Sequence, residues 1–304
     1  MRLPLRWLSF SMFALLVSSI SLASSAPSPT KVASKATSKA SSKAVSKTAV
    51  APANKPDLRS NAVFVIDEAN SSIIFARQAD TPVPIASITK LMTALVVLDA
   101  KQPLDEPIKI VADDRTGDLG GKSRLGIGTT LTRGDLLHLA LMSSENHAAH
   151  AIGRSYPGGI AACVQAMNAK AKALGMTSAR FVDPTGLSSR NVASPADLSK
   201  LVIAAAQDQT ISAFSTDSEH SVLIGKREVE FRNTNTLVSK PTWNIVVQKT
   251  GYISEAGKCL VMKTVIQGRS VVIVLMDSFG KYTRVADASR IKKWMEAGTT
   301  TARL

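Results

Sequence analysis

Residues 84–95 read PIASITKLMTAL, and their apolar residues recur with the period of an α-helix. The pattern predicts an amphipathic helix that has a serine at its head. Ser87 and Lys90 are three positions apart, so both fall on one face of this helix and the hydroxyl can meet the amine. A lysine can serve as the base for a serine nucleophile only when its amine is neutral, which requires burial or a second cation nearby. The stretch therefore needs partners from elsewhere in the chain to form a catalytic site.

The Ser-x-x-Lys spacing alone is a weak indication of catalysis, because the same spacing occurs in unrelated parts of the chain, at Ser28/Lys31 and Ser289/Lys292. The first pair lies in a low-complexity segment, and the second lies on the polar face of a predicted C-terminal helix. Of the three pairs named, only Ser87/Lys90 has apolar surroundings. Without further motifs, a capped helix start with a solvated lysine is the simpler interpretation of that pair.

The N-terminus has the pattern of a secretory signal peptide. Arg2 and Arg6 precede the apolar run 7–22, and small residues follow at 23–26. This order predicts a signal peptide over residues 1–26 that is removed on export to the periplasm. Retention of the apolar run as a membrane anchor is the alternative, but the run is short, contains several serines and ends in small residues.

Residues 27–57 consist almost wholly of Ala, Ser, Thr, Val, Pro and Lys, and lysine recurs every four residues from 31 to 47. This spacing would stack like charges on one helix face without an apolar stripe to offset them, so we expect a flexible basic linker. Residues 1–60 contain nine Lys and Arg residues against one Asp, which is net +8 of the chain's +14. Such a segment is either a solvated spacer or a means of loose association with the membrane or the anionic wall. Nucleic-acid binding is not expected, because basic and aromatic residues do not interleave and no reader motif is present.

Residues 58–304 provide enough sequence for one globular domain with a large core. Strands are predicted at both ends of this domain, and helices are predicted between them. The strands are expected at 61–67, 71–77, 221–224, 229–232, 244–250, 258–267 and 270–277, and the helices at 88–96, 136–142, 146–155, 159–174, 195–207 and 282–297. This order indicates an α/β protein of the α+β type, in which an antiparallel sheet from both chain ends packs on helices and carries an inserted α-helical region.

Two further motifs supply the partners that Ser87 and Lys90 require. Ser144-Glu145-Asn146 follows the predicted helix 136–142, and Lys249-Thr250-Gly251 ends an apolar strand. The set S-x-x-K, S-x-N and K-T-G is found in penicillin-binding proteins and class A β-lactamases. S-x-N is common, but K-[ST]-G occurs once in the chain, and the three motifs occur in the expected order and in the expected elements.

On these motifs, and on residues 167–176 and 181–187, the chain resembles low-molecular-mass penicillin-binding proteins of the D-alanyl-D-alanine carboxypeptidase and endopeptidase type. Within that family it is most similar to the penicillin-binding protein 7 endopeptidase subgroup. The resemblance covers residues 58–298 and implies a β-lactamase/transpeptidase-like fold. Glu145 replaces the Asp of the β-lactamase motif, which favours the penicillin-binding proteins because their middle position varies.

The resemblance implies a role for each residue of the first two motifs. Ser87 would attack the carbonyl of the penultimate D-alanine of a peptidoglycan peptide stem and form an acyl-enzyme, with Lys90 as proton acceptor. Ser144 would pass the proton to the leaving amine, and Asn146 would hold a substrate amide. These assignments predict a serine peptidase.

The third motif would bind substrate and support the chemistry. Lys249 is expected to help keep Lys90 neutral by repulsion and to attract an acidic stem. Thr250 and Gly251 would let an extended peptide pair with the strand edge. The backbone N–H groups of Ser87 and Tyr252 would form an oxyanion hole.

Two other classes of protein fit the sequence less well than a peptidase does. A β-lactamase needs a placed glutamate and a water for fast deacylation, and no acidic residue between Asn146 and Lys249 has a convincing motif context. We therefore expect β-lactams to act as covalent inhibitors that form long-lived adducts. A catalytically silent wall-binding protein would have no reason to keep the motif residues intact, which argues against this class.

The choice between endopeptidase and carboxypeptidase depends on what the leaving-group side of the site accepts, and the sequence does not show this. The chain stops at Leu304, soon after the last predicted helix, without the additional β domain and amphipathic tail of common carboxypeptidases. This favours a periplasmic endopeptidase that cuts D-alanyl to diaminopimelate cross-links, with a D-alanine carboxypeptidase as the alternative.

Metal and cysteine chemistry are not expected to contribute. His147 and His150 are three apart on a predicted helix, but no H-E-x-x-H motif is present, so we interpret them as polar helix residues. Serine and lysine chemistry requires no metal or organic cofactor. Cys163 and Cys259 are predicted to be buried free thiols, with oxidation after export as the alternative.

Overall fold

The computed structural model describes residues 55–115 and 123–301. These residues belong to a unit that spans Thr48–Leu304. The predicted signal peptide, nearly all of the predicted basic linker and the Ser28/Lys31 pair lie outside the described residues, as do residues 116–122 of a Gly-rich passage.

Strands from both chain ends form one antiparallel sheet, as predicted. Its order is β2-β1-β11-β10-β9, so the N-terminal hairpin pairs directly with the last strand of the chain. Strand β9, which contains the Lys-Thr-Gly motif, lies at an edge of this sheet. The strands are β1 (Ser60–Asp67), β2 (Ser72–Arg77), β9 (Asn244–Ile253), β10 (Gly257–Ile266) and β11 (Arg269–Ser278).

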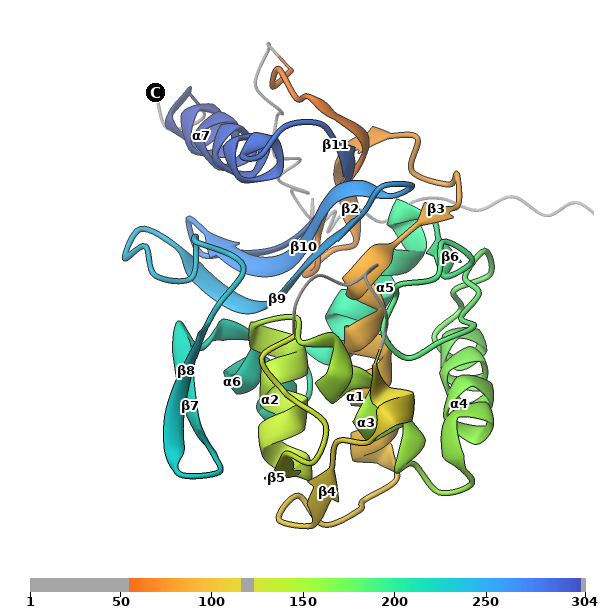
Figure 1. The fold of residues 1–304 in the computed structure, drawn as a ribbon. Coiled ribbons are helices and arrows are strands. Elements are labelled where there is room, and N and C mark those ends of the chain that lie inside the picture. The colour runs from red at the N-terminus through yellow and green to blue at the C-terminus, as the bar shows by residue number, and fades with distance from the viewer. Residues whose placement is uncertain (1–54, 116–122, 302–304) are drawn as a thin grey trace, which may run out of the picture. The chain divides into compact units, whose positions relative to one another are not determined.

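Helices cover both faces of the sheet (Figure 1). Helix α7 (Thr283–Thr301) packs on one face, and the helical region packs on the other. Strand β11 is therefore buried on both sides: Ile273 and Leu275 face the α7 side, whereas Val272 and Val274 face the helical region. Alternate side chains of a strand point to opposite faces, which explains why this strand is an unbroken apolar run in the sequence.

Helix α1 lies inside the helical region. It contacts α2, α3, α4 and α5, and every residue from 89 to 97 is buried. The prediction of an amphipathic helix is therefore wrong, because neighbouring helices cover the side that was expected to face water. The helices are α1 (Thr89–Asp99), α2 (Arg133–Met142), α3 (Asn146–Arg154), α4 (Gly159–Ala173), α5 (Pro195–Ala205) and α6 (Gln209–Thr216).

The predicted strands at 221–224 and 229–232 are confirmed, and they form a hairpin that is separate from the main sheet. Strands β7 (Glu219–Ile224) and β8 (Arg227–Arg232) form a two-stranded sheet of their own. The sequence did not predict α6 or the short elements, which have too few residues to show a period. The short elements are the strands β3 (Val83–Pro84), β4 (Pro107–Lys109), β5 (Thr130–Thr132) and β6 (Val192–Ala193) and the 3₁₀ turns η1 (Ala86–Ile88) and η2 (Ala112–Asp114).

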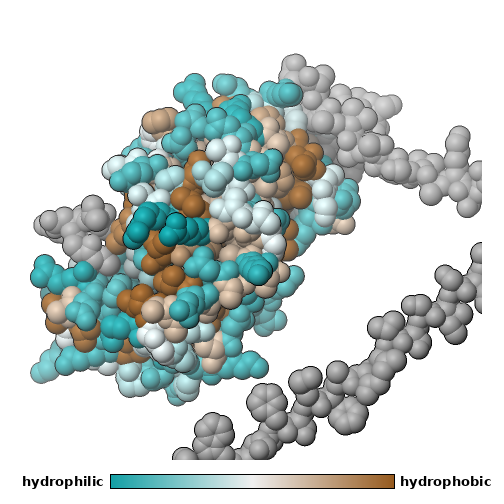
Figure 2. All heavy atoms as spheres, turned by 90° about the vertical axis from the view of Figure 1, so that its right-hand side faces the viewer, coloured by the Kyte–Doolittle hydropathy of each residue, from teal (hydrophilic) through white to brown (hydrophobic). Residues whose placement is uncertain are grey.

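The surface of the described part of the chain carries both hydrophilic and apolar residues. Figure 2 shows the face that lies to the right in Figure 1, where hydrophilic residues predominate and apolar residues form patches between them. Such a mixture is common on folded domains. Over residues 55–115 and 123–301, no helix has both the length and the apolar character needed to cross a membrane.

Candidate active site

Ser87 lies in the η1 turn directly before α1, and two glycines let other segments approach this turn closely. A Cβ atom added to Gly186 would lie 2.0 Å from the carbonyl oxygen of Ala86. A Cβ atom added to Gly251 would lie 3.0 Å from the carbonyl oxygen of Ile85 and 3.2 Å from the backbone nitrogen of Ser87. The loop that contains Gly186 and strand β9 therefore both pack against the backbone that carries the serine.

Lys90 is the centre of the hydrogen bonds in the site. Its side chain is buried, with 1% exposed, and Nζ donates to Ser87 Oγ at 2.8 Å, Asn146 Oδ1 at 2.7 Å and the Thr185 carbonyl oxygen at 2.7 Å. An ammonium has three protons, and these three acceptors account for all of them. When Lys90 is neutral, its lone pair can instead accept the proton of Ser87. The interpretation of Lys90 as a solvated lysine is therefore wrong.

Burial lowers the pKa of Lys90 from 10.5 to about 7, although the negative charges of Asp183 and Glu145 oppose the shift. Burial also lowers the pKa of Lys249 well below 10.5, and the charges of Lys90 and Arg284 add to this effect. Burial is the main cause of the low pKa of Lys90. Repulsion between the two ammonium groups is mutual, so the help that we expect from Lys249 is secondary to burial.

This pKa predicts how acylation of the protein depends on pH. Lys90 must be neutral to accept the proton of Ser87, so the acylation rate constant should rise with pH and level off above about 7. Below that pKa, each unit of pH should lower the rate constant about tenfold. The measurement is the second-order rate constant for acylation by benzylpenicillin, from two units below the pKa to two units above it. A rate constant that stays flat or falls across this range contradicts the role of Lys90 as base.

The Ser-x-Asn motif connects α2 to α3. Ser144 adopts a left-handed backbone conformation (φ +63°), and Asn146 begins α3 and reaches Lys90. The Glu145 side chain accepts hydrogen bonds from the backbone N–H of His147 at 3.2 Å and from Ser123 Oγ at 2.5 Å. These bonds fix the turn that places Asn146 beside Lys90.

The Lys-Thr-Gly motif lies on the edge strand β9. Thr250 Oγ1 lies 2.6 Å from Thr234 Oγ1, and the backbone N–H of Thr234 donates to the carbonyl oxygen of Met142 at 3.2 Å. Thr234 therefore joins the Lys-Thr-Gly strand to the end of α2, directly before the Ser-x-Asn motif. Tyr252 is 58% exposed, and the Lys258 ammonium lies 4.0 Å from the centre of its ring. The contacts thus bring Ser87, Lys90, Asn146, Lys249, Thr250 and Gly251 together, with Ser144 and Tyr252 adjacent to them in sequence.

The sequence did not predict the role of the loop after Phe181. Asp183 accepts hydrogen bonds from the backbone N–H groups of Thr185 at 2.7 Å and Gly186 at 2.8 Å and from the Thr185 hydroxyl at 2.6 Å. These bonds orient the Thr185 carbonyl that accepts from Lys90. The Asp-Pro-Thr-Gly order is typical of a turn, but only the folded chain places this turn over α1.

Arg284 is a second residue that the sequence did not single out. It belongs to α7, and the atoms Nε and Nη1 of its guanidinium are buried without a hydrogen-bond partner. Burial lowers its pKa, and its charge acts on Lys249 and Cys259. Burial of guanidinium N–H groups without an acceptor is costly.

His147 and His150 make hydrogen bonds within the fold, and Cys163 and Cys259 are buried in it. His147 Nδ1 lies 2.9 Å from the Leu125 carbonyl oxygen, and His150 Nδ1 lies 2.8 Å from Asp114 Oδ1. Among the residues that the structure describes, no group of three or more His, Cys, Asp or Glu side chains could hold a metal ion. Cys163 and Cys259 are free and buried, and burial raises their pKa to about 11 and about 12.

Comparison with known proteins shows which family and which solved structures the chain resembles. The family model for D-alanyl-D-alanine carboxypeptidase matches residues 47–280. The chain is 48% identical over 248 residues to the D-alanyl-D-alanine endopeptidase of Pseudomonas aeruginosa, covering 81% of this chain and 80% of that protein. It is also 48% identical over 252 residues to the D-alanyl-D-alanine endopeptidase of Escherichia coli K12, covering 82% and 81%.

Solved structures share the fold. The Streptomyces K15 DD-transpeptidase superposes with a TM-score of 0.74 at 25% identity, over 80% of this chain and 99% of that chain. The D-alanyl-D-alanine carboxypeptidase of Mycobacterium tuberculosis H37Rv superposes with a TM-score of 0.73 at 26% identity, over 82% and 96%. These likenesses confirm the predicted transpeptidase-like fold. The extent of the family match and the identity to the two endopeptidases show that the chain belongs to the D-alanyl-D-alanine carboxypeptidase family of serine peptidases.

Proposed function

We propose that the protein is a serine-type D-alanyl-D-alanine endopeptidase, which cuts D-alanyl to diaminopimelate cross-links of peptidoglycan through an acyl-enzyme on Ser87. The observation that carries this proposal is the 2.8 Å contact between Lys90 Nζ and Ser87 Oγ in a site where burial lowers the pKa of Lys90 to about 7. The preference for cross-links rests on the two relatives at 48% identity, both named endopeptidases.

In the first step, neutral Lys90 accepts the proton of Ser87 while Oγ attacks the carbonyl carbon of the D-alanyl residue. The carbonyl oxygen becomes an oxyanion, which the backbone N–H groups of Ser87 and Tyr252 stabilise by about 3 kcal/mol per donor. Ser144 donates a proton to the leaving amine as the C–N bond breaks, and the proton held by Lys90 replaces it. The donor stem is then an ester of Ser87.

In the second step, a water molecule attacks the ester and Ser87 recovers its proton as it leaves. Asp183 is poorly placed to activate this water, because its carboxylate already accepts bonds from Thr185, Gly186 and Ser188. A β-lactam would acylate the same hydroxyl: its ring C–N bond opens, the whole molecule becomes an ester of Ser87, and this ester would be hydrolysed slowly. We therefore propose that β-lactams inhibit the protein covalently.

Substrate would lie along the free edge of β9. Thr250 and Gly251 belong to this edge, so an extended stem can add to the sheet as a further strand. Asn146 would hold a substrate amide, and the buried Lys249 and the partly buried Arg284 would attract the carboxylate next to the bond that is cut. No metal or organic cofactor is required for this chemistry.

The carboxypeptidase remains the second candidate, because relatives with that name match the chain at lower identity. An example is the D-alanyl-D-alanine carboxypeptidase of Streptomyces sp. K15, which is 26% identical over 267 residues. Both activities use the same acyl-enzyme and differ in the group that leaves.

We further propose that residues 1–26 are a cleaved signal peptide, that residues 27–57 are a basic linker, and that residues 58–304 act in the periplasm. The basic composition of the linker supports loose association with the membrane or the wall. Nucleic acid is not a proposed partner.

The proposed activity can be tested by incubating the purified protein with cross-linked muropeptide dimers and, separately, with monomeric pentapeptide. We expect dimers to be converted to monomers, as followed by liquid chromatography and mass spectrometry. Release of terminal D-alanine from the pentapeptide with intact dimers would identify a carboxypeptidase. No change in either substrate would support the silent wall-binding alternative.

A further inference from the structure

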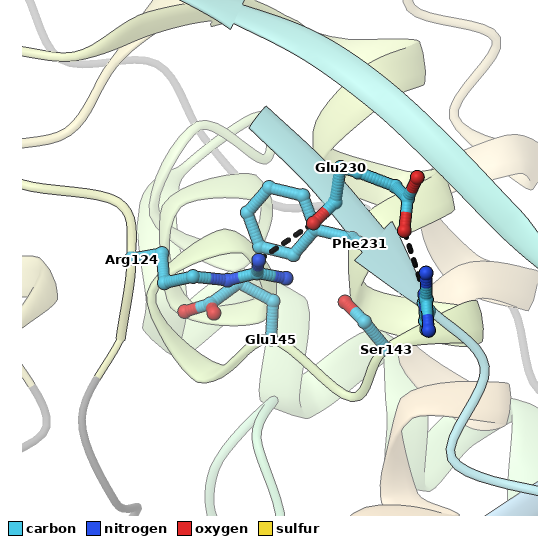
Figure 3. A pocket seen from close by; sticks show the side chains of 6 residues that line it. Arg124, Ser143, Glu145, Glu230 and Phe231 are labelled. Atoms are coloured by element: carbon cyan, nitrogen blue, oxygen red, sulfur yellow. Dashed lines mark hydrogen bonds and ion pairs between the residues drawn. The ribbon is translucent and has the colours of Figure 1, made fainter. Parts of the chain in front are cut away.

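A polar pocket of about 420 Å³ opens beside the Ser-x-Asn motif (Figure 3). It lies between the start of α3, the segment at residues 123–125 and strand β8. The lining residues are Arg124, Ser143, Glu145, Glu230, Phe231 and Arg232. The volume is within the range of pockets that bind small molecules. It is larger than a single D-alanine needs.

The pocket adjoins the candidate active site at one end. Ser143 and Glu145 flank Ser144, which is the group assigned to protonate the leaving amine. Two residues after the β8 wall, Thr234 contacts Thr250 of the Lys-Thr-Gly motif at 2.6 Å. The pocket is therefore next to the part of the site from which the leaving group departs.

The pocket holds two guanidinium groups. Arg124 stacks on the ring of Phe231, with 3.8 Å between the guanidinium carbon and the ring centre, and donates from Nη1 to the Glu230 carbonyl oxygen at 2.6 Å. Figure 3 shows its other terminal nitrogen directed toward the space between Phe231 and Ser143. Arg232 forms an ion pair with Glu230 at 2.6 Å and remains 76% exposed. Two oriented guanidinium groups can bind carboxylates with paired hydrogen bonds.

Cross-link cleavage and D-alanine release differ on this side of the site. When a cross-link is cut, the leaving group is a whole second stem, which is acidic and carries free carboxylates. When a terminal D-alanine is removed, the leaving group is one small amino acid. We propose that this pocket is the binding site for the leaving stem, and that Arg124 and Arg232 bind its carboxylates. The proposal rests on the endopeptidase function proposed above and names the residues that select the cross-linked substrate.

The test compares two substrates in the full protein and in the variants Arg124→Gln and Arg232→Gln. One substrate is the cross-linked muropeptide dimer, and the other is diacetyl-L-Lys-D-Ala-D-Ala, whose leaving group is D-alanine alone. We expect kcat/KM for the dimer, divided by kcat/KM for the tripeptide, to fall about tenfold or more in each variant, because a hydrogen bond to a charged group is lost. Arg227→Gln is the matched control, since it removes the same charge at the exposed far end of β8. The ratio in this control should stay within about twofold of the wild-type ratio.

The outcomes separate the two proposals. A wild-type protein that leaves dimers intact but acts on the tripeptide overturns the endopeptidase function and the pocket assignment with it. A wild-type protein that cuts dimers, with an unchanged ratio in both variants, overturns the pocket assignment alone. Replacing Arg124 could shift β8 and lower kcat/KM equally for both substrates. The ratio would then be unchanged, and this result would also count against the pocket assignment. Arg124→Lys should restore part of the ratio, because the positive charge is kept.

Discussion

Replacing Ser87 with alanine is expected to lower the rate of dimer cleavage by about 10⁴-fold or more, because loss of a nucleophile removes the whole covalent route. The fold should persist in this variant. The hydroxyl contributes one hydrogen bond, to Lys90 Nζ at 2.8 Å, and Lys90 keeps its bonds to Asn146 and Thr185. The net cost of such a bond is about 1 kcal/mol. Dimer cleavage and thermal unfolding of the two proteins measure these two effects.

The chain provides its own control for this substitution. Ser289 has the same spacing to Lys292, but it lies on α7 and its hydroxyl bonds to the Val285 carbonyl oxygen at 3.1 Å. Ser289→Ala should therefore retain wild-type activity. If Ser87→Ala retained more than about one hundredth of the activity while folded, a serine nucleophile at position 87 would be ruled out.

Gly186→Ala is expected to damage both stability and activity. Gly186 has φ +82°, and an added Cβ would lie 2.0 Å from the Ala86 carbonyl oxygen and 2.5 Å from its carbon. The loop or the η1 turn must then move, and either movement displaces Ser87 relative to Lys90. We expect the free energy of unfolding to fall by about 3 kcal/mol or more. The melting temperature should fall by about 6 °C or more, and most of the activity should be lost.

Gly175→Ala separates crowding from backbone strain. Gly175 has φ +69°, but no atom lies within 4 Å of its added Cβ. The free energy of unfolding of this control should fall by about 1 kcal/mol, because only the left-handed backbone is strained. Its activity should be kept. Equal losses of stability in the two variants would mean that contact with Ala86 contributes nothing.

The sequence predicted those parts of the fold and site that depend on local pattern. Strands β1 and β2, helices α2 and α5 and the long strands near the C-terminus follow from periodicity. The three motifs placed Ser87, Asn146 and Lys249 in the expected elements, and the contacts bring these elements together.

Features that depend on long-range packing could not be predicted in this way. The burial of α1 on all sides, the Thr185 carbonyl beside Lys90 and the buried atoms Nε and Nη1 of Arg284 each depend on elements far apart in the sequence. The burial that lowers the pKa of Lys90 has the same origin. No local pattern reports which side of a helix a distant loop will cover.

The proposed mechanism depends on acylation of Ser87, and a single labelling measurement tests this step most directly. The protein is incubated with benzylpenicillin, digested with trypsin and analysed by tandem mass spectrometry. Cleavage after Arg77 and Lys90 yields the peptide 78–90, in which Ser87 is the only serine. We predict that this peptide gains the whole mass of benzylpenicillin at Ser87. An adduct on another peptide, or no adduct on a protein that cleaves dimers, would contradict the account.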